Sequence, residues 1–339
     1  MGRDRDATVA MPSRKGLEQS PVTVGVVLAR GEAPPEGLDL IAEVTEIELA
    51  DDAPTLRRVL DKVEVLLVWD FRTDLLGGSW PSVSPLRWIH AASVGVDAVL
   101  VDHVVDSEIV VTNTRGVFER PIAEYVLALI LAFAKDLPAT LELQRKQRWV
   151  HRETQMIQGR RAVVLGAGGV ARALVPLLRA AGMEVDVVGR TARDNDPDFG
   201  RVVSTADVDA LLVHADFVVL ALPRTDQTRG YLDERRLALL DPGARIVNVG
   251  RGALIDEDAL LAALECRAIA GAALDVFAVE PLPPEHPFWA MEHAIVSPHM
   301  SGDRFGWERA VVEGFAENLR RWLAGEELLN RVDKRPMLR

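Results

Sequence analysis

The sequence predicts an α/β protein built from doubly wound parallel sheets and divided over two domains. Three observations lead to this prediction. The chain has 339 residues, a length that favours two domains. Short apolar segments rich in β-branched residues alternate with helical patterns along most of the chain, as in repeated βαβ units. One of these apolar segments runs directly into a glycine-rich turn that opens a helix.

The first half of the chain predicts a small α/β unit. Strands are expected at Val22–Leu28, Val63–Val68, Trp88–Ala92 and Ile109–Thr112, with a helix at Ala53–Lys62. Pro121 then opens a helix that continues to Ala134 and is apolar on almost every side. Such a helix is buried between domains or between subunits. The second possibility indicates a homodimer that pairs through residues 121–150.

The second half shows a plainer βαβ rhythm. Strands are expected at Ala162–Leu165, Val185–Val188, Phe217–Ala221, Arg245–Val249, Ile269–Leu274 and Ala294–Ser297, with a helix at Val170–Ala181. Strands that alternate with helices in this way form a parallel sheet. Residues 303–323 follow as one amphipathic helix.

Composition limits the classes of partner and site. Hydrophobic residues make up 48% of the chain, enough for a sizeable core, and the formal net charge of -12 argues against nucleic acid as a partner. The first twenty residues are polar and charged, and no segment reaches the ~18 apolar residues of a membrane span. We therefore expect a cytoplasmic protein that binds no membrane and has a disordered N-terminal arm over residues 1–20. The single cysteine, Cys266, excludes an internal disulfide, and no cluster of ligand residues has the spacing of a metal site.

The glycine-rich turn predicts a dinucleotide cofactor. It covers Gly166–Ala171 (GAGGVA) and stands between a strand and a helix, with a second strand ending about 20 residues later. Glycines at these positions let the backbone approach a pyrophosphate at the helix N-terminus. A tight turn that serves packing alone is the alternative. Cofactor contacts are expected from Gly166, Gly168, Gly169 and Val170.

The end of the second strand indicates which dinucleotide. NAD sites carry an acidic residue there, but Asp186 lies too early, inside the strand. Arg190, Thr191 and Arg193 follow instead, and guanidinium groups bind a ribose phosphate through paired hydrogen bonds. The sequence thus favours NADP, with NAD possible. The alternative is a solvated surface turn without a role in binding.

Three polar residues follow later strands of the second half. Arg251, Glu280 and His299 each stand near the carboxyl end of a predicted strand, where open α/β sheets bind their ligands. Each one alone could be structural, since a single histidine after a strand is more often a hydrogen-bonded polar residue than a catalyst. Their order and surroundings decide the matter.

Several segments together resemble the D-isomer-specific 2-hydroxyacid dehydrogenase family, in particular its glyoxylate and hydroxypyruvate reductases. The resemblance covers most of the chain, from about residue 22 to residue 323. It rests on ASVGVD (92–97), the segment from Asn113 to Ala128, the loop from Leu222 to Gly230, Arg251-Gly252, DVFAVEP (275–281) and SPH (297–299).

The resemblance implies an enzyme with two Rossmann-like domains, the cofactor domain being inserted into the substrate domain. The substrate domain would comprise residues 21–107 and 302–339, and the dinucleotide-binding domain residues 108–301. The enzyme would transfer a hydride between NAD(P)H and a small 2-keto acid or D-2-hydroxy acid. The cofactor supplies the hydride in such reactions, so the protein has to place the reactants and handle the proton.

The resemblance also implies roles for individual residues. Arg251 would bind the substrate carboxylate and polarise the carbonyl group, and the N–H groups of Val94 and Gly95 would bind the same carboxylate. His299 would donate the proton, and the negative charge of Glu280 would stabilise the protonated imidazole. Asp275 would orient the nicotinamide carboxamide. Further cofactor contacts are implied for Leu222, Pro223, Thr228, Val249 and His299.

Two departures and two alternatives remain at this point. Val94 replaces the usual alanine of the substrate loop, and Ala171 replaces the third glycine of the turn. A non-catalytic, dinucleotide-sensing regulator of the same fold is one alternative, although an intact Arg–Glu–His set shows no loss of catalysis. A family dehydrogenase for another substrate, phosphoglycerate or phosphite, is the other. Formate dehydrogenases resemble the family with glutamine at the position of Glu280, which argues against formate.

Overall fold

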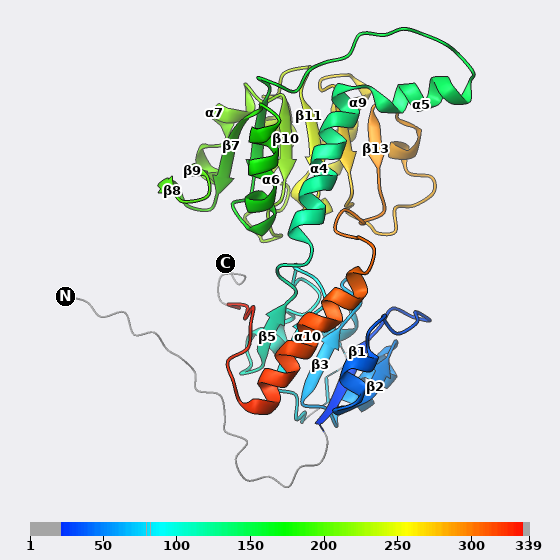
Figure 1. The fold of residues 1–339 in the computed structure, drawn as a ribbon, viewed down its shortest axis with the longest axis vertical. Helices are drawn as coiled ribbons and strands as arrows, with labels where there is room; N and C mark the ends of the chain where they lie inside the picture. Colours follow the sequence, from blue (N-terminus) through cyan, green and yellow to red (C-terminus); the bar gives the residue numbers. More distant parts are fainter. Residues whose placement is uncertain (1–21, 79, 82, 335–339) are drawn as a thin grey trace, which may run out of the picture. The chain divides into compact units, whose positions relative to one another are not determined.

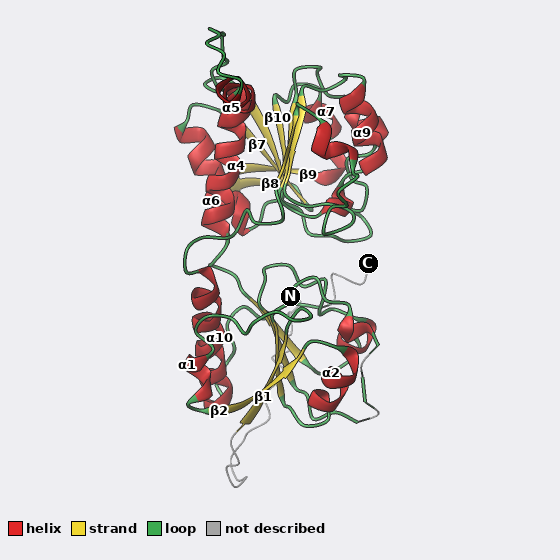
Figure 2. Ribbon diagram, turned by 90° about the vertical axis from the view of Figure 1, so that its right-hand side faces the viewer, coloured by secondary structure: helices red, strands yellow, loops and turns green. Residues whose placement is uncertain are grey.

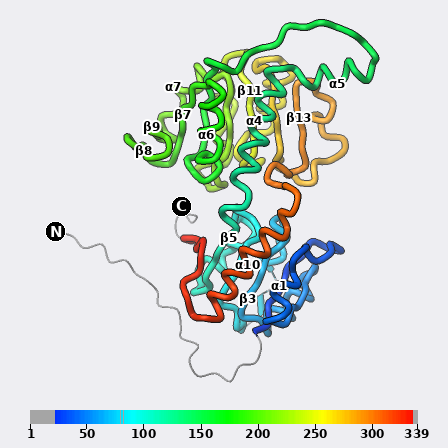
Figure 3. Tube along the Cα trace, viewed as in Figure 1, coloured from blue at the N-terminus to red at the C-terminus, as the bar shows by residue number. Residues whose placement is uncertain are grey.

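The chain divides into two compact units in the computed structural model (Figure 1), which describes residues 22–334 except 79 and 82. Unit 1 consists of the chain up to Val117 together with the segment that begins at Phe305, and unit 2 runs from Phe118 to Arg304. Figure 3 shows this division by colour, because the blue and red parts of the trace share one unit while green to orange form the other. The predicted N-terminal arm, residues 1–20, lies outside the described residues.

Unit 1 is built around a five-stranded parallel sheet of order β2-β1-β3-β4-β5. Its strands are β1 (Val22–Val27), β2 (Thr45–Ala50), β3 (Val65–Val68), β4 (Trp88–Ala91) and β5 (Val110–Asn113). Its helices are α1 (Asp39–Ala42), α2 (Ala53–Leu60), α3 (Asp102–Val105) and α10 (Trp307–Ala324), with a 3-10 turn at Leu75–Gly77. Figure 2 shows α1 and α10 on one face of this sheet and α2 on the other.

Unit 2 is built around an eight-stranded sheet of order β13-β12-β11-β10-β6-β7-β9-β8. Its strands are β6 (Arg161–Leu165), β7 (Glu184–Gly189), β8 (Arg193–Asp196), β9 (Gly200–Ser204), β10 (Phe217–Leu220), β11 (Arg245–Asn248), β12 (Gly271–Leu274) and β13 (Ala294–Val296). Its helices are α4 (Glu119–Ala134), α5 (Leu137–Arg145), α6 (Gly169–Ala180), α7 (Asp209–Leu212), α8 (Glu234–Leu237) and α9 (Glu257–Glu265). Short 3-10 turns lie at Thr205–Asp207, Gly252–Leu254 and Pro287–Ala290.

Two apolar layers form the core of unit 2, one on each face of the sheet. Helices α4 and α6 cover one face and pack against each other, and α7 and α9 cover the other face (Figure 2). Val163, Val218 and Ile246, on the central strands, are fully buried. This arrangement confirms the predicted α/β class with helices on both faces of a largely parallel sheet. No helix among the described residues is long and apolar enough to cross a membrane.

The sequence patterns miss three of the strands. Strand β2 has the sequence TEIELA, in which charged residues interrupt the apolar run because this edge strand is partly exposed. Strands β8 and β9 form a hairpin at the other edge, and β8 runs antiparallel to β9. Strand β8 (RDND) is polar and β9 (GRVVS) has one buried residue, Val202, so the hairpin lacks the apolar signal of a buried strand. The sheet of unit 2 is therefore mixed at this edge, and Arg193 lies in a strand where a loop is expected.

Two predicted boundaries differ from those in the structure. The first domain boundary is expected after residue 107. In the structure β5 pairs with β4 in the sheet of unit 1, so the boundary follows Val117. The last helix is expected from residue 303 but begins at Trp307, because Gly306 in the left-handed conformation forms its N-cap. Phe305 and Gly306 form a turn before it, and residues 303 and 304 have no regular structure.

The C-terminal segment completes unit 1 from the far end of the sequence. Phe315 of α10 stacks on Trp88 of β4 with 5.3 Å between ring centroids. Val332 N–H donates to the Val111 carbonyl at 2.8 Å, so the segment covers the outer edge of β5. The ammonium group of Lys334 donates to three backbone carbonyls at the end of α3 and in the following loop, at 2.8, 2.6 and 3.0 Å.

A buried histidine stands at the centre of unit 1. His90 is 2% exposed, and its Nδ1 and Nε2 lie 2.7 and 3.2 Å from the hydroxyl oxygens of Thr112 and Thr114. The Thr114 hydroxyl donates to the Ala91 carbonyl, so it must accept from Nε2–H of His90. The Thr112 hydroxyl accepts from the Trp88 indole and donates its own proton to Nδ1. Every group is satisfied only by the neutral imidazole, and burial lowers the pKa of His90 to about 3.

This histidine makes the stability of unit 1 sensitive to acid. The unfolded chain binds a proton at His90 below pH 6.5 while the folded chain does not, so the free energy of unfolding falls as the pH decreases. Between pH 6.5 and about 3, the free energy of unfolding of wild type should fall by about 1.4 kcal/mol per pH unit more than that of a His90→Gln variant. Urea unfolding followed by tryptophan fluorescence at pH 7, 6 and 5 measures this difference. Parallel pH slopes for the two proteins would contradict the expectation.

Candidate active site

The glycine turn lies between β6 and α6, as the sequence predicts. Gly166 has a φ of 123°, and a Cβ added there would lie 2.5 Å from the Ala221 carbonyl oxygen, so only glycine fits. Gly168 forms the N-cap of α6 in an extended conformation and provides no side chain to the helix N–H groups. Gly169 leaves room for the Glu119 side chain of α4, which would lie 2.8 Å from an added Cβ. The turn thus presents backbone N–H groups at a helix N-terminus, the chemistry that binds phosphate.

The residues predicted to select the dinucleotide follow β7. Arg190 and Thr191 are exposed directly after Gly189, and Arg193 opens β8. Arg193 Nε donates to Asp196 Oδ2 at 2.9 Å, whereas Arg190 forms no hydrogen bond or ion pair with any described residue. The guanidinium group of Arg190 is therefore the more accessible of the two for an anionic ligand. The sequence did not indicate that Arg193 has an acidic partner.

The loop after β10 is held together by one of the predicted residues. Leu222 and Thr228 are 7% and 9% exposed. The Thr228 hydroxyl donates to the Pro223 carbonyl at 2.7 Å and accepts from Thr225 N–H at 2.8 Å. Thr228 thus stabilises the loop itself, whatever further contact it makes. Val249, at the end of β11, is 9% exposed.

Arg251 stands in a tightly constrained loop after β11. The buried side chain of Asn248 donates to the Arg251 carbonyl at 3.0 Å and accepts from Gly250 N–H at 3.1 Å. Arg251 Nη1 donates to the Gly250 carbonyl at 2.8 Å. A Cβ added to Gly252 would lie 1.9 Å from the carbonyl carbon of Phe277. The loop that carries Arg251 therefore packs directly on the loop that leads to Glu280.

Glu280 and His299 form a close pair. His299 Nδ1 lies 2.7 Å from Glu280 Oε2, and Glu280 Oε1 accepts from Phe277 N–H at 2.9 Å. The two side chains are 23% and 17% exposed, so solvent screens their interaction only in part. A carboxylate can only accept hydrogen bonds, so Nδ1 carries the hydrogen in this pair. Strands β11, β12 and β13 are parallel neighbours in the sheet. Arg251, Glu280 and His299, which follow these strands, therefore lie at the carboxyl ends of the sheet.

Asp275 anchors the loop that carries His299. It is fully buried at the end of β12, and its Oδ1 accepts from the Ser297 hydroxyl and Met300 N–H at 2.7 and 3.0 Å. Its Oδ2 accepts from Ser301 N–H at 2.9 Å. The segment on both sides of His299, which has a φ of 56°, is thus fixed by one carboxylate. The family resemblance predicts that Asp275 contacts the nicotinamide. The structure shows that Asp275 also holds the His299 loop, as Asn248 holds the Arg251 loop.

The predicted substrate loop lies in unit 1, directly after β4. Ser93 Oγ donates to the Gly95 carbonyl and Asn113 Nδ2 to the Val94 carbonyl, each at 2.6 Å. The N–H groups of Val94 and Gly95 form no hydrogen bond with any residue that the structure describes. The carbonyls of this loop are thus held by side chains, while its two adjacent N–H groups have no acceptor among the described residues.

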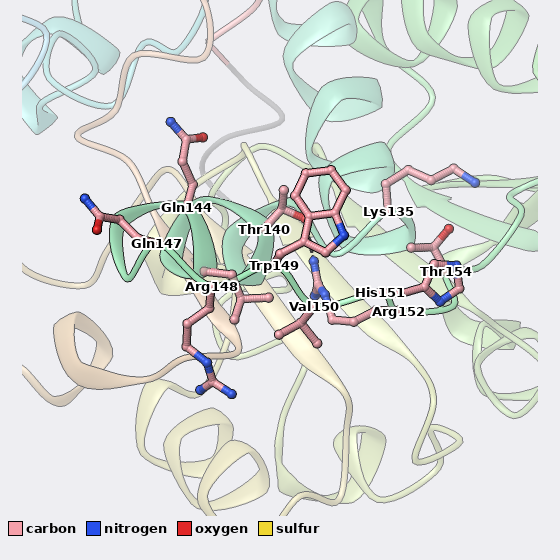
Figure 4. Close-up of a pocket in the computed structure, with 11 residues that line it drawn as sticks. Lys135, Thr140, Gln144, Gln147, Arg148, Trp149, Val150, His151, Arg152 and Thr154 are labelled. Carbon is pink, nitrogen blue, oxygen red and sulfur yellow. Dashed lines mark hydrogen bonds between the residues drawn. The ribbon is translucent and has the colours of Figure 1, made fainter.

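A separate hollow of about 640 Å³ lies beside α5 and contains none of the predicted site residues. Its lining comes from Lys135, from α5 and from the segment that follows this helix, as Figure 4 shows. The indole of Trp149 lies close to Thr140 in this view and is fully exposed, and α5 buries none of its own residues. Apolar groups on this segment therefore lie at the surface of unit 2.

Comparison with known proteins gives a family match. A model of the D-isomer-specific 2-hydroxyacid dehydrogenase NAD-binding domain matches residues 127–301. A glyoxylate reductase of Aeropyrum pernix is 30% identical over 322 residues, which cover 91% of this chain and 96% of that protein.

Solved structures agree with this match. A D-isomer-specific 2-hydroxyacid dehydrogenase of Xanthobacter autotrophicus, crystallised with NADPH and MES, is 30% identical with a TM-score of 0.74, over 92% of this chain and 98% of that one. An NADPH-dependent glyoxylate/hydroxypyruvate reductase of Sinorhizobium meliloti, in complex with NADP and malonate, is 26% identical with a TM-score of 0.82. The alignment covers 94% of this chain and 98% of that structure.

Proposed function

Because the chain belongs to the D-isomer-specific 2-hydroxyacid dehydrogenase family, we propose that it reduces a small 2-keto acid, glyoxylate or hydroxypyruvate, with NADPH. The Glu280–His299 pair carries this proposal, since a histidine held at 2.7 Å by a carboxylate is suited to proton transfer. Relatives named glyoxylate reductase and a neighbour named glyoxylate/hydroxypyruvate reductase support the substrate class.

The residues of the site divide the work on the substrate. Arg251 binds the carboxylate and polarises the keto oxygen through its fixed positive charge. The N–H groups of Val94 and Gly95 would also bind a substrate carboxylate. His299 passes a proton from Nε2 to the keto oxygen, while Glu280 accepts from Nδ1–H and stabilises the imidazolium. In the oxidation direction His299 takes the proton back.

The cofactor site fits a dinucleotide. The positive φ of Gly166 and the open N-terminus of α6 suit a pyrophosphate, so Gly166, Gly168, Gly169 and Val170 would hold it. Leu222, Pro223, Thr228 and Val249 would line the site further along the sheet, and Asp275 would orient the nicotinamide. When bound, the nicotinamide supplies the hydride that reduces the keto carbon.

Arg190 is proposed to bind the 2′-phosphate of NADP, with Thr191 and Arg193 beside it. We expect wild type to use NADPH at least about tenfold more efficiently than NADH, and Arg190→Ala to lower kcat/KM for NADPH by about tenfold, since it loses a charge-assisted contact. The value for NADH should stay within about twofold. Steady-state kinetics with both cofactors measures this, and Arg201→Ala, an exposed arginine near Asp194, is the control. A preference for NADH that Arg190→Ala does not change would contradict NADP use.

A substrate panel tests the proposed activity. Glyoxylate, hydroxypyruvate, pyruvate and phosphohydroxypyruvate are supplied with NADPH, and phosphite and 3-phosphoglycerate with NADP. We expect turnover of glyoxylate or hydroxypyruvate to exceed that of the others. Turnover of a phosphorylated acid or of phosphite instead would assign another substrate within the family. Dinucleotide binding without turnover of any acid would favour the non-catalytic regulator.

Three further properties are part of the proposal. Unit 2 would bind the dinucleotide and carries Arg251, Glu280 and His299, and unit 1 carries the substrate loop with Val94 and Gly95. The chain would form a homodimer through the 121–150 region, where α5 and Trp149 present apolar groups at the surface of unit 2. A cytoplasmic location is favoured by the single cysteine, Cys266.

A further inference from the structure

The β8–β9 hairpin, next to the end of β7, contains a set of paired charges. Three ion pairs occur in it and on the adjacent α6: Arg193–Asp196 at 2.9 Å, Arg172–Asp198 at 2.6 Å and Arg201–Asp194 at 4.0 Å. Arg190 has no such partner among the described residues. The net positive charge near the end of β7 therefore comes from Arg190, and Arg193 must contribute in another way.

Asp196 differs from the other two acids because it is buried and fixed. Its side chain is 6% exposed, against 43% for Asp198 and 88% for Asp194. Asp196 Oδ1 accepts from the N–H groups of Asp198 and Phe199 at 3.0 and 3.2 Å, and Oδ2 accepts from Arg193 Nε. Burial by itself raises the pKa of Asp196, but these hydrogen bonds outweigh it and the pKa is lowered. Asp196 is therefore a charged, immobile acceptor.

The rest of the Arg193 guanidinium group lies over the end of β7. Its Nη1 is 3.9 Å from the position of a Cβ added to Gly189, and that position is 3.1 Å from Ala167 Cβ in the glycine turn. Neither Nη1 nor Nη2 has an acceptor among the described residues, because only Nε is engaged. In doubly wound sheets the adenosine ribose binds at this strand end. Two N–H-bearing nitrogens are thus held beside the expected ribose.

We propose that Asp196 is a positioning residue for 2′-phosphate recognition, which it serves by holding Arg193 through Nε so that Nη1 and Nη2 are directed at the end of β7. Arg190 supplies the net positive charge, and Arg193 supplies two N–H-bearing nitrogens in a fixed position. An arginine fixed in this way loses less side-chain entropy when the ligand binds, so part of the ordering is already present in the free protein. This inference rests on the proposed use of NADP.

Direct binding to the full-length protein tests it without turnover. Calorimetry gives the Kd of adenosine 2′,5′-bisphosphate and of adenosine 5′-monophosphate for wild type, Asp196→Ala, Arg193→Ala and the double variant. We expect Asp196→Ala to weaken the bisphosphate about tenfold and to leave the monophosphate within about twofold. The double variant should bind no more weakly than Arg193→Ala alone, because both changes remove the same contact. Asp196→Asn, which keeps one acceptor oxygen, should recover part of the affinity.

Asp198→Ala is the matched control, because the Asp198 side chain pairs with Arg172 and not with Arg193. The substitution keeps the hydrogen bond from the backbone N–H of residue 198 to Asp196. It should change neither Kd by more than about twofold. Equal weakening of both ligands by Asp196→Ala would show a merely structural role for the hairpin, and tighter bisphosphate binding would show that Asp196 only neutralises Arg193. Either result overturns the inference. No wild-type preference for the bisphosphate overturns NADP use as well, whereas a wild-type preference that Asp196→Ala leaves intact overturns the positioning role alone.

Discussion

Replacing His299 by alanine is expected to lower kcat for reduction of the keto acid by about three orders of magnitude, within the range for loss of a general acid. The substrate carboxylate is bound by other groups, so KM should change by only a few-fold. Glu280→Gln keeps an acceptor for Nδ1–H of His299 but removes the charge that stabilises the imidazolium, so its loss should be smaller, about 10 to 100-fold. Steady-state kinetics at saturating NADPH measures both values.

His214→Gln is a suitable control because this histidine is exposed and lies in the short loop before β10. It should retain wild-type kcat. The dissociation constant of NADPH, measured by fluorescence, should be similar for His299→Ala and wild type. A kcat within tenfold of wild type in His299→Ala would exclude His299 as the proton donor.

Arg251→Gln is expected to lower kcat/KM for the keto acid by about three orders of magnitude. The change removes a charge-assisted contact with the carboxylate together with the polarisation of the keto oxygen, and each effect is large in a partly buried site. Arg251→Lys restores the charge without the forked geometry and should recover only about tenfold of the loss. Both variants should have a lower kcat as well as a higher KM, because the keto oxygen gains negative charge in the transition state.

The loop around Arg251 makes stability a necessary control. Its shape is set by Asn248 and by the contact of Gly252 with Phe277, neither of which involves the Arg251 side chain. The variant loses only the bond from Arg251 Nη1 to the Gly250 carbonyl among the hydrogen bonds described above. We therefore expect the thermal midpoint of Arg251→Gln to stay within a few degrees of wild type. An unchanged kcat/KM in a folded variant would show that another group binds the carboxylate.

The buried parts of the fold follow from the sequence because their signal is strong. Strand β10 (FVVL) is an apolar run in which every residue is buried, and in β11 (RIVN) the three residues after Arg245 are buried. The polar edge strands β2 and β8 lack that signal. Strand β2 pairs with the preceding strand β1, and β8 pairs with β9 through a hairpin turn. A pattern of apolar residues does not report either pairing.

The candidate site divides in the same way. The positions of Arg251, Glu280 and His299 at neighbouring strand ends follow from the βαβ order together with the family resemblance. The residues that hold these loops and side chains in place cannot be predicted in this way. Asn248, Asp275 and Asp196 act through hydrogen bonds to backbone groups or to arginine, and those contacts depend on how loops return toward the sheet.

The two-segment construction of unit 1 bears on how the protein is made. Unit 2 is one continuous stretch, so it can complete its core as soon as residue 304 has left the ribosome. Unit 1 cannot, because Trp88 and the edge of β5 have to wait for Phe315 and Val332, which are synthesised after unit 2. During that interval the five-stranded sheet has one apolar face without its long helix and is open to aggregation. The segment of unit 1 that precedes unit 2 is thus vulnerable until the segment that follows unit 2 has been synthesised.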